Sequence, residues 1–237
     1  MLSFVVCSID DGKFAAASAS IAAAAGGEPF EIVGIHDARS LCEGWNRGLA
    51  RSRGDPVVFC HDDILLFAPD LPGRLARHLA HFDVVGIAGT DRCAGMEWSN
   101  AGILHAHGAV MHGREDAAEF HFYGAGADPG VDADAVGGIQ AMDGVFLATR
   151  RSTALAVGFD EAAFDGWHGY DADFTFRAYL AGLRLAVALD VPILHRSRGR
   201  PDPGLMLYHE RFAAKFAGRL PSGFGAWVDL RTPVAIP

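Results

Sequence analysis

The chain has 237 residues, half of them apolar, and its formal net charge is −9. This length can bury the core of one large domain, and a charged fraction of only 21% excludes a disordered chain. The negative charge excludes a general electrostatic attraction to nucleic acid or to anionic membranes. A phosphate-bearing ligand would therefore need a local source of positive charge, such as a metal ion or a helix N-terminus.

The cysteines and the N-terminus indicate a reducing compartment. Cys7, Cys42, Cys60 and Cys93 are widely spaced, so we expect small buried side chains and neither a zinc site nor disulfides. The first ten residues carry no basic segment and no long apolar segment, and they read as a strand. No apolar run approaches the length of a membrane span, so we expect no transmembrane segment and a cytoplasmic protein.

The first ninety residues alternate between predicted strands and helices. Apolar runs predict strands at residues 2–8, 30–35, 56–60 and 84–88. Helix composition and capping residues predict helices at residues 13–25, 40–52 and 70–82. Such alternation predicts a parallel, doubly wound sheet whose ligands gather at the carboxyl ends of the strands. Attention therefore falls on residues 8–11, 36–39 and 61–64.

The middle of the chain differs from both ends. Residues 90–138 are rich in Gly, His, Asp and Ala and weakly periodic, so we expect a loop-rich insertion with an irregular loop at residues 124–130. Its histidines leave open a second metal site or an ordinary polar loop: His105, His107, His112 and His121. Strands follow at residues 145–148 and 184–189, and helices at residues 171–180 and 204–218.

An acidic cluster directly follows the third predicted strand. Residues 59–64 read Phe-Cys-His-Asp-Asp-Ile, so His61, Asp62 and Asp63 would project from the carboxyl end of that strand. Hard divalent cations bind oxygen ligands, and Mn²⁺ also accepts imidazole. From these residues alone, a metal site and simple turn capping are both open.

Two carboxylates open the helix predicted at residues 171–180. Asp171 and Asp173 stand where the free N–H groups of a helix stabilise negative charge. Because side chains two residues apart point in different directions, one can cap the helix while the other faces a ligand. His195 follows the apolar run at residues 191–194, and alone it could be structural or a ligand.

In their order along the chain, these motifs resemble the family 2 glycosyltransferases, in particular their compact bacterial members. The resemblance is carried by residues 31–37, 46–48, 54–64, 143–151, 158–177 and 182–195. It implies a single-domain α/β GT-A fold, with a Rossmann-like, mostly parallel central sheet flanked by helices, the loop-rich insertion and a C-terminal helix. A nucleotide-binding half would span about residues 1–90 and an acceptor and catalytic half about residues 91–220, before a tail at residues 221–237.

The resemblance also implies a metal site and a general base. Asp63 falls on the last carboxylate of the family's DxD motif, and His61 stands where its first carboxylate usually is. Together with His195 they would hold Mn²⁺ or Mg²⁺. Asp171 falls on the general base, and Tyr170 replaces the Glu that usually precedes it.

Further residues fall on the two substrate sides of the family. The donor side would comprise Ser8, Asp10, Asp37, Asn46, Asp62 and Arg198, the last in an arginine-rich run that could pair with phosphate. The acceptor side would comprise Asp143, Gly144, Trp167, His168 and Asp173. Trp167 could stack on a sugar face or simply pack in the core, and Trp98 could act in the same way.

The activity implied is a metal-dependent, inverting transfer of a sugar from a nucleotide-diphosphate sugar to a glycan or another hydroxyl-bearing acceptor. An alternative is a non-catalytic nucleotide-sugar or glycan-binding protein on the same fold, because His61 and Tyr170 both stand at acidic positions of the family. A nucleotidyltransferase is disfavoured because no Gly-rich basic loop follows the first strand.

Overall fold

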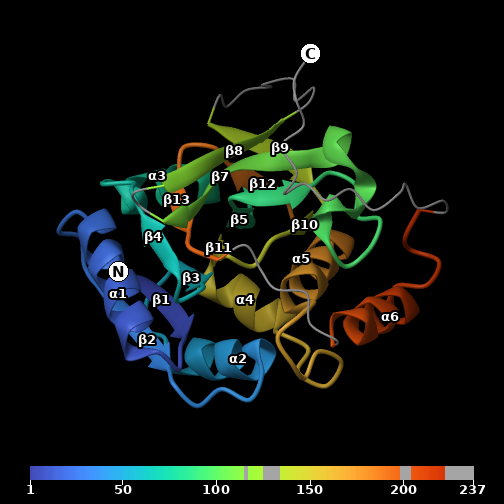
Figure 1. Ribbon diagram of the computed structural model, residues 1–237, viewed down its shortest axis with the longest axis horizontal. Helices are drawn as coiled ribbons and strands as arrows, with labels where there is room; N and C mark the ends of the chain where they lie inside the picture. The colour runs from blue at the N-terminus through green and yellow to red at the C-terminus, as the bar shows by residue number, and fades with distance from the viewer. Residues whose placement is uncertain (115–116, 125–133, 198–203, 222–237) are drawn as a thin grey trace.

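The larger of two β-sheets forms the centre of the molecule in the computed structural model, which describes residues 1–114, 117–124, 134–197 and 204–221 (Figure 1). The strand order is β2-β1-β3-β11-β5-β12-β9. These strands are β1 (Leu2–Cys7), β2 (Phe30–Ile35), β3 (Val57–Cys60), β5 (Val84–Gly86), β9 (Ala135–Ile139), β11 (Phe146–Thr149) and β12 (Leu185–Ala188). Only β11 and β9 run antiparallel to their neighbours, so the sheet is mixed but mostly parallel, as the sequence predicts.

A second sheet follows the order β10-β6-β7-β13-β4, with β8 paired to β7. Its strands are β4 (Ile64–Leu66), β6 (Ala88–Thr90), β7 (Ala106–Arg114), β8 (Ala117–Gly124), β10 (Ala141–Met142) and β13 (Ile193–His195). The prediction that residues 90–138 are mostly loop is therefore wrong for β7 and β8, which form a long antiparallel pair. Glycines and histidines within β7 hide its alternation in the sequence, and pairing with β6, β13 and β8 stabilises it as a strand. Residues 125–130 of the predicted loop, and the tail from residue 222, lie outside the described residues.

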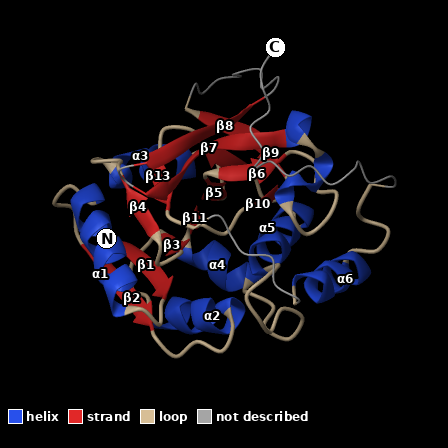
Figure 2. Ribbon diagram, in the orientation of Figure 1, coloured by secondary structure: helices blue, strands red, loops and turns tan. Residues whose placement is uncertain are grey.

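The helices surround the larger sheet (Figure 2). They are α1 (Asp11–Ala24), α2 (Leu41–Arg51), α3 (Leu71–Leu79), α4 (Arg151–Val157), α5 (Tyr170–Leu180) and α6 (Leu205–Lys215), with short 3₁₀ turns η1 (Trp98–Ala101) and η2 (Ile103–His105). Side-chain caps fix two starts, since Asp10 accepts the Lys13 N–H at 3.0 Å and Ser40 accepts the Glu43 N–H at 3.1 Å. None of the helices in the described ranges could cross a bilayer, given their length and polarity.

The core lies on both faces of the larger sheet. Neighbouring residues of β1 belong to different clusters, because successive side chains of a strand point to opposite faces. Val5 belongs to the same core cluster as Trp45 of α2 and Phe174 of α5, whereas Val6 belongs to the cluster that contains residues of α1 and α3. All four cysteines are free; Cys42, Cys60 and Cys93 are buried, as predicted, whereas Cys7 is half-buried. Because apolar side chains fill both faces of the larger sheet, polar side chains are found at the ends of its strands.

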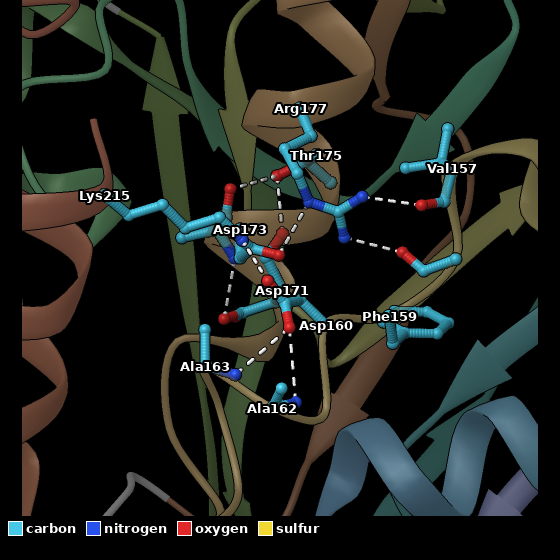
Figure 3. Close-up of polar contacts among 12 residues, drawn as sticks. Val157, Phe159, Asp160, Ala162, Ala163, Asp171, Asp173, Thr175, Arg177 and Lys215 are labelled. Carbon is cyan, nitrogen blue, oxygen red and sulfur yellow. Dashed lines mark hydrogen bonds and ion pairs between the residues drawn. The ribbon is translucent and has the colours of Figure 1, made fainter.

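Buried charges connect α5 with α6 and with the loop that follows α4. Asp173, with no exposed surface, accepts a hydrogen bond from Arg177 Nε at 2.8 Å, and Lys215 Nζ lies 2.5 Å from its other oxygen (Figure 3). Lys215 Nζ also donates to Asp160 at 2.7 Å, and the Arg177 guanidinium donates to the carbonyls of Val157 and Gly158. This network fixes the N-terminal half of α5, which begins at the candidate site.

Candidate active site

Two imidazoles and one carboxylate meet where β3 and β13 end. His61 follows β3, Asp63 precedes β4, and the pairing of β13 with β4 places His195 opposite Ile64. His195 Nε2 lies 3.3 Å and His61 Nδ1 lies 3.9 Å from Asp63 Oδ1. One ligand atom from each residue lies within 4.8 Å of the others. The structure thus brings together the metal ligands expected from the sequence.

The chemistry of this group fits a divalent cation. Asp63 is buried, and its Oδ1 accepts no hydrogen bond of good geometry within the described chain. Burial would raise the pKa of Asp63, but the His195 and His61 imidazoles hold it well below its usual range. Burial and the neighbouring His195 lower the pKa of His61, which favours the neutral imidazole that a metal requires. One carboxylate and two imidazoles suit Mn²⁺ better than the strongly oxygen-preferring Mg²⁺.

The metal-ligand group is linked to the start of α5 through Tyr170. The Tyr170 hydroxyl lies 2.6 Å from His61 Nε2, and the next residue is Asp171. Asp171 accepts hydrogen bonds from the backbone N–H groups of Gly144 at 2.8 Å and Ala172 at 2.9 Å. A side chain at Gly144 would bring its Cβ to 2.4 Å from the Tyr170 ring, so only glycine permits this approach. The candidate base is therefore one residue from Tyr170, which contacts the candidate ligand His61.

Asp143 adds a second carboxylate next to Asp171. It accepts hydrogen bonds from the Trp98 indole at 3.0 Å and from the Val145 N–H at 2.9 Å. Burial, followed by the negative charge of Asp143, raises the pKa of Asp171 to about 7. A carboxyl group with a pKa near neutrality can take up a proton and release it again, which suits a general base.

Three of the predicted donor residues lie together, and two others lie apart from them. Ser8, at the end of β1, donates a hydrogen bond to Asp62 Oδ2 at 2.7 Å, and the Ser8 hydroxyl oxygen accepts one from the Asp10 N–H. These three residues therefore lie together in space. The exposed Asp37 pairs with Arg47 on the outer surface. Asn46 forms two hydrogen bonds with the backbone of Phe159, at 2.8 and 3.0 Å. The Asn46 amide therefore connects α2 to the loop before α5. The remaining predicted donor residue, Arg198, lies outside the described residues.

The predicted acceptor residues are similarly divided. Asp143 and Gly144 lie against Asp171, as described above. Trp167 is 50% exposed in the loop preceding α5, and the ring of His168 lies 6.0 Å from that of Tyr208 in α6. Asp173 is fully buried in its ion pairs with Arg177 and Lys215, so its carboxylate does not face an acceptor.

One histidine of the predicted insertion lies beside the site, a position that the sequence did not indicate. The ring of His112 in β7 lies 5.6 Å from that of His195, because β7 pairs with β13. His105 and His107 instead lie 2.7 and 2.9 Å from separate oxygens of Asp91. The side chain of His121 lies outside what the structure describes. Only recognition of β7 as a strand could have placed His112.

Comparisons with known proteins identify the family and the fold of the chain. The sequence profile of the Glycosyltransferase like family matches residues 3–200. Among solved structures, GalNAc-T7 with UDP, GalNAc and Mn²⁺ is similar at a TM-score of 0.59 and 11% identity, over 90% of this chain and 47% of that chain. A197 from STIV is similar at a TM-score of 0.48 and 11% identity, over 82% of this chain and 84% of that chain.

The present chain therefore spans about half the length of GalNAc-T7, at 47% of it. No protein with a curated description matches it by sequence. The profile covers most of the chain, and the solved structure of GalNAc-T7 supports the same architecture. The chain belongs to the Glycosyltransferase like family and has the GT-A fold.

Proposed function

We propose that this protein transfers a glycosyl group from a nucleoside-diphosphate sugar to an acceptor hydroxyl, with inversion and with the help of a divalent cation. The observation that carries the proposal is the continuous path from Asp63 through His61 and Tyr170 to Asp171. It joins a group suited to a cation with a carboxyl suited to proton transfer. The solved structure of GalNAc-T7 with UDP, GalNAc and Mn²⁺ supports the donor class and the metal.

Asp171 is the proposed general base. A sugar hydroxyl is a poor nucleophile, and a positioned carboxylate accelerates its attack by taking its proton. The proton passes to a carboxylate oxygen of Asp171 while the acceptor oxygen bonds to the anomeric carbon and the bond to the diphosphate breaks. The N–H groups of Gly144 and Ala172 hold the carboxylate in place. With the base and the leaving group on opposite faces of the sugar, a single displacement inverts the anomeric centre.

His61, Asp63 and His195 would hold the cation. When bound, a divalent cation stabilises the negative charge that gathers on the departing diphosphate. The chain needs this positive charge because its own net charge is −9. Ser8 and Asp62, joined by a hydrogen bond at the end of β1, are the proposed contacts to the nucleoside. The exposed Trp167 is the proposed platform for the acceptor.

A donor panel tests the proposal. The purified protein is incubated with nucleotide sugars with and without Mn²⁺, and released nucleoside diphosphate and glycosylated products are measured. We expect one donor to release its nucleoside diphosphate only with metal, by transfer or by hydrolysis with water as the acceptor. Calorimetric binding of a donor without any release would instead favour a non-catalytic binding protein. Release of pyrophosphate from a nucleoside triphosphate would indicate a nucleotidyltransferase.

A further inference from the structure

The two nitrogens of the His61 ring face different partners. Nε2 lies 2.6 Å from the Tyr170 hydroxyl, and Nδ1 lies 3.9 Å from Asp63 Oδ1. Nδ1 is therefore on the side of Asp63 and His195, where the proposed cation would be held. The hydrogen bond to Tyr170 fixes the orientation of the ring that presents Nδ1 to this side.

The hydrogen bond also bears on the tautomer. A neutral imidazole carries one N–H, and a ring nitrogen can bind a metal only through its free lone pair. If Nδ1 is the ligand, Nε2 must carry the hydrogen and donate it to Tyr170 Oη. The oxygen of a tyrosine hydroxyl can accept this hydrogen, so Tyr170 is a suitable partner for Nε2–H.

Tyr170 is itself held firmly. Its side chain is 5% exposed, and its ring packs edge-on against Trp45 at 5.0 Å between centroids. The absent side chain of Gly144 leaves room for this ring. The hydroxyl therefore has a defined position relative to β3, where His61 begins its loop.

We propose that Tyr170 is a positioning residue for the metal ligand His61, whose Nε2–H it accepts so that Nδ1 is free to bind the cation. This inference rests on the proposed function for the role of the cation. It also connects two departures from the family pattern: the residues at these two acidic positions contact one another. A metal-binding histidine needs a partner for its second nitrogen, and Tyr170 supplies that partner.

The test uses the full chain without any donor. Tyr170→Phe removes only the hydroxyl, and Tyr208→Phe makes the same change at a tyrosine of α6 that hydrogen-bonds Asp165. Mn²⁺ binding is measured by calorimetry and by the electron paramagnetic resonance of free Mn²⁺. We expect Tyr170→Phe to bind Mn²⁺ on the order of 10–100-fold more weakly than wild type, and Tyr208→Phe to match wild type. Equal affinities in the two variants would overturn the proposal.

A second measurement needs no folded variant of Tyr170. Nitrogen-15 NMR of the metal-free wild-type protein reports which nitrogen of His61 carries the hydrogen, with the signals assigned by their loss in His61→Gln. We expect the Nε2–H tautomer in the wild-type protein. An Nδ1–H tautomer in wild type would overturn the proposal. Neither measurement involves turnover, so an absence of glycosyl transfer would count against the proposed function alone.

Discussion

Lys215 Nζ, in the last turn of α6, lies 2.5 Å from the fully buried carboxylate of Asp173 in α5. The same ammonium group donates to Asp160 at 2.7 Å (Figure 3). Asp173 is two residues from the proposed base Asp171. The C-terminal helix is thus part of the structure that supports the catalytic half of the molecule.

Lys215→Met is expected to destabilise the fold by about 1–3 kcal/mol, because it removes one of two cations that compensate the buried charge of Asp173. Arg177 continues to pair with Asp173 and limits the loss. Urea unfolding followed by circular dichroism measures the change. Lys13→Met, at the exposed other lysine of the chain, is the matched control and should change the unfolding free energy little. Equal stability of the two variants would refute the structural role of Lys215.

Asp171→Asn is expected to lower turnover by roughly 10²–10⁴-fold, since the amide cannot take the proton of the acceptor. Donor and Mn²⁺ affinities should persist, because Asp171 is not one of the proposed ligands of either. Product formation at saturating donor is the measurement, and thermal unfolding verifies the fold. Asp11→Asn makes the same chemical change at an exposed residue of α1 and serves as the control. Turnover of Asp171→Asn equal to that of this control would disprove the assignment of the base.

Much of the fold and the centre of the site could be predicted from local sequence patterns. Apolar runs located β1, β2 and β3, and the capping residue Ser40 located the start of α2. Asp63 was found because it follows a buried strand, and the strand ends of an α/β sheet carry ligands. Such signals depend on residues that are close along the chain.

Long-range contacts leave no comparable signal. The hydrogen bond between His61 and Tyr170 joins residues 109 positions apart, so the sequence showed Tyr170 only as a departure from a motif. The ion pair of Lys215 with Asp173 depends on the packing of α6, which helical periodicity does not specify. The antiparallel direction of β11 likewise depends on its neighbours β3 and β5.

Turnover is expected to rise with pH through about 7, because burial and Asp143 raise the pKa of Asp171 to that value and only the carboxylate form can act as a base. Asp143→Asn removes the neighbouring negative charge, so the midpoint of the pH profile should move to lower pH. The profile of kcat/KM against pH measures this, with Asp11→Asn as the control. A midpoint that stays in place in Asp143→Asn would show that another group controls the profile.

The raised pKa of Asp171 has a consequence for stability as well. Between the ordinary value of 3.8 and about 7, the folded carboxyl binds a proton that the unfolded one has already lost. The contribution of this group to stability is therefore fully present below pH 3.8 and is lost as pH rises to about 7. In the metal-free protein, Asp171→Asn should remove this component of the pH dependence, as measured by urea unfolding at a series of pH values. An unchanged dependence in the variant would contradict the shift.

Mn²⁺ is expected to raise the melting temperature of the wild-type protein, and EDTA to reverse the rise, because a ligand that binds only the folded state stabilises it. A metal concentration 100 times the Kd corresponds to about 2.7 kcal/mol. Asp63→Asn should abolish the rise, since it removes the carboxylate whose Oδ1 faces both imidazoles. Asp91→Asn is the matched control: Asp91 also lies between two histidines, yet each of its oxygens is already within hydrogen-bond distance of one ring. A stabilisation by Mn²⁺ that survives in Asp63→Asn and disappears in Asp91→Asn would show that the metal binds at Asp91, His105 and His107 instead.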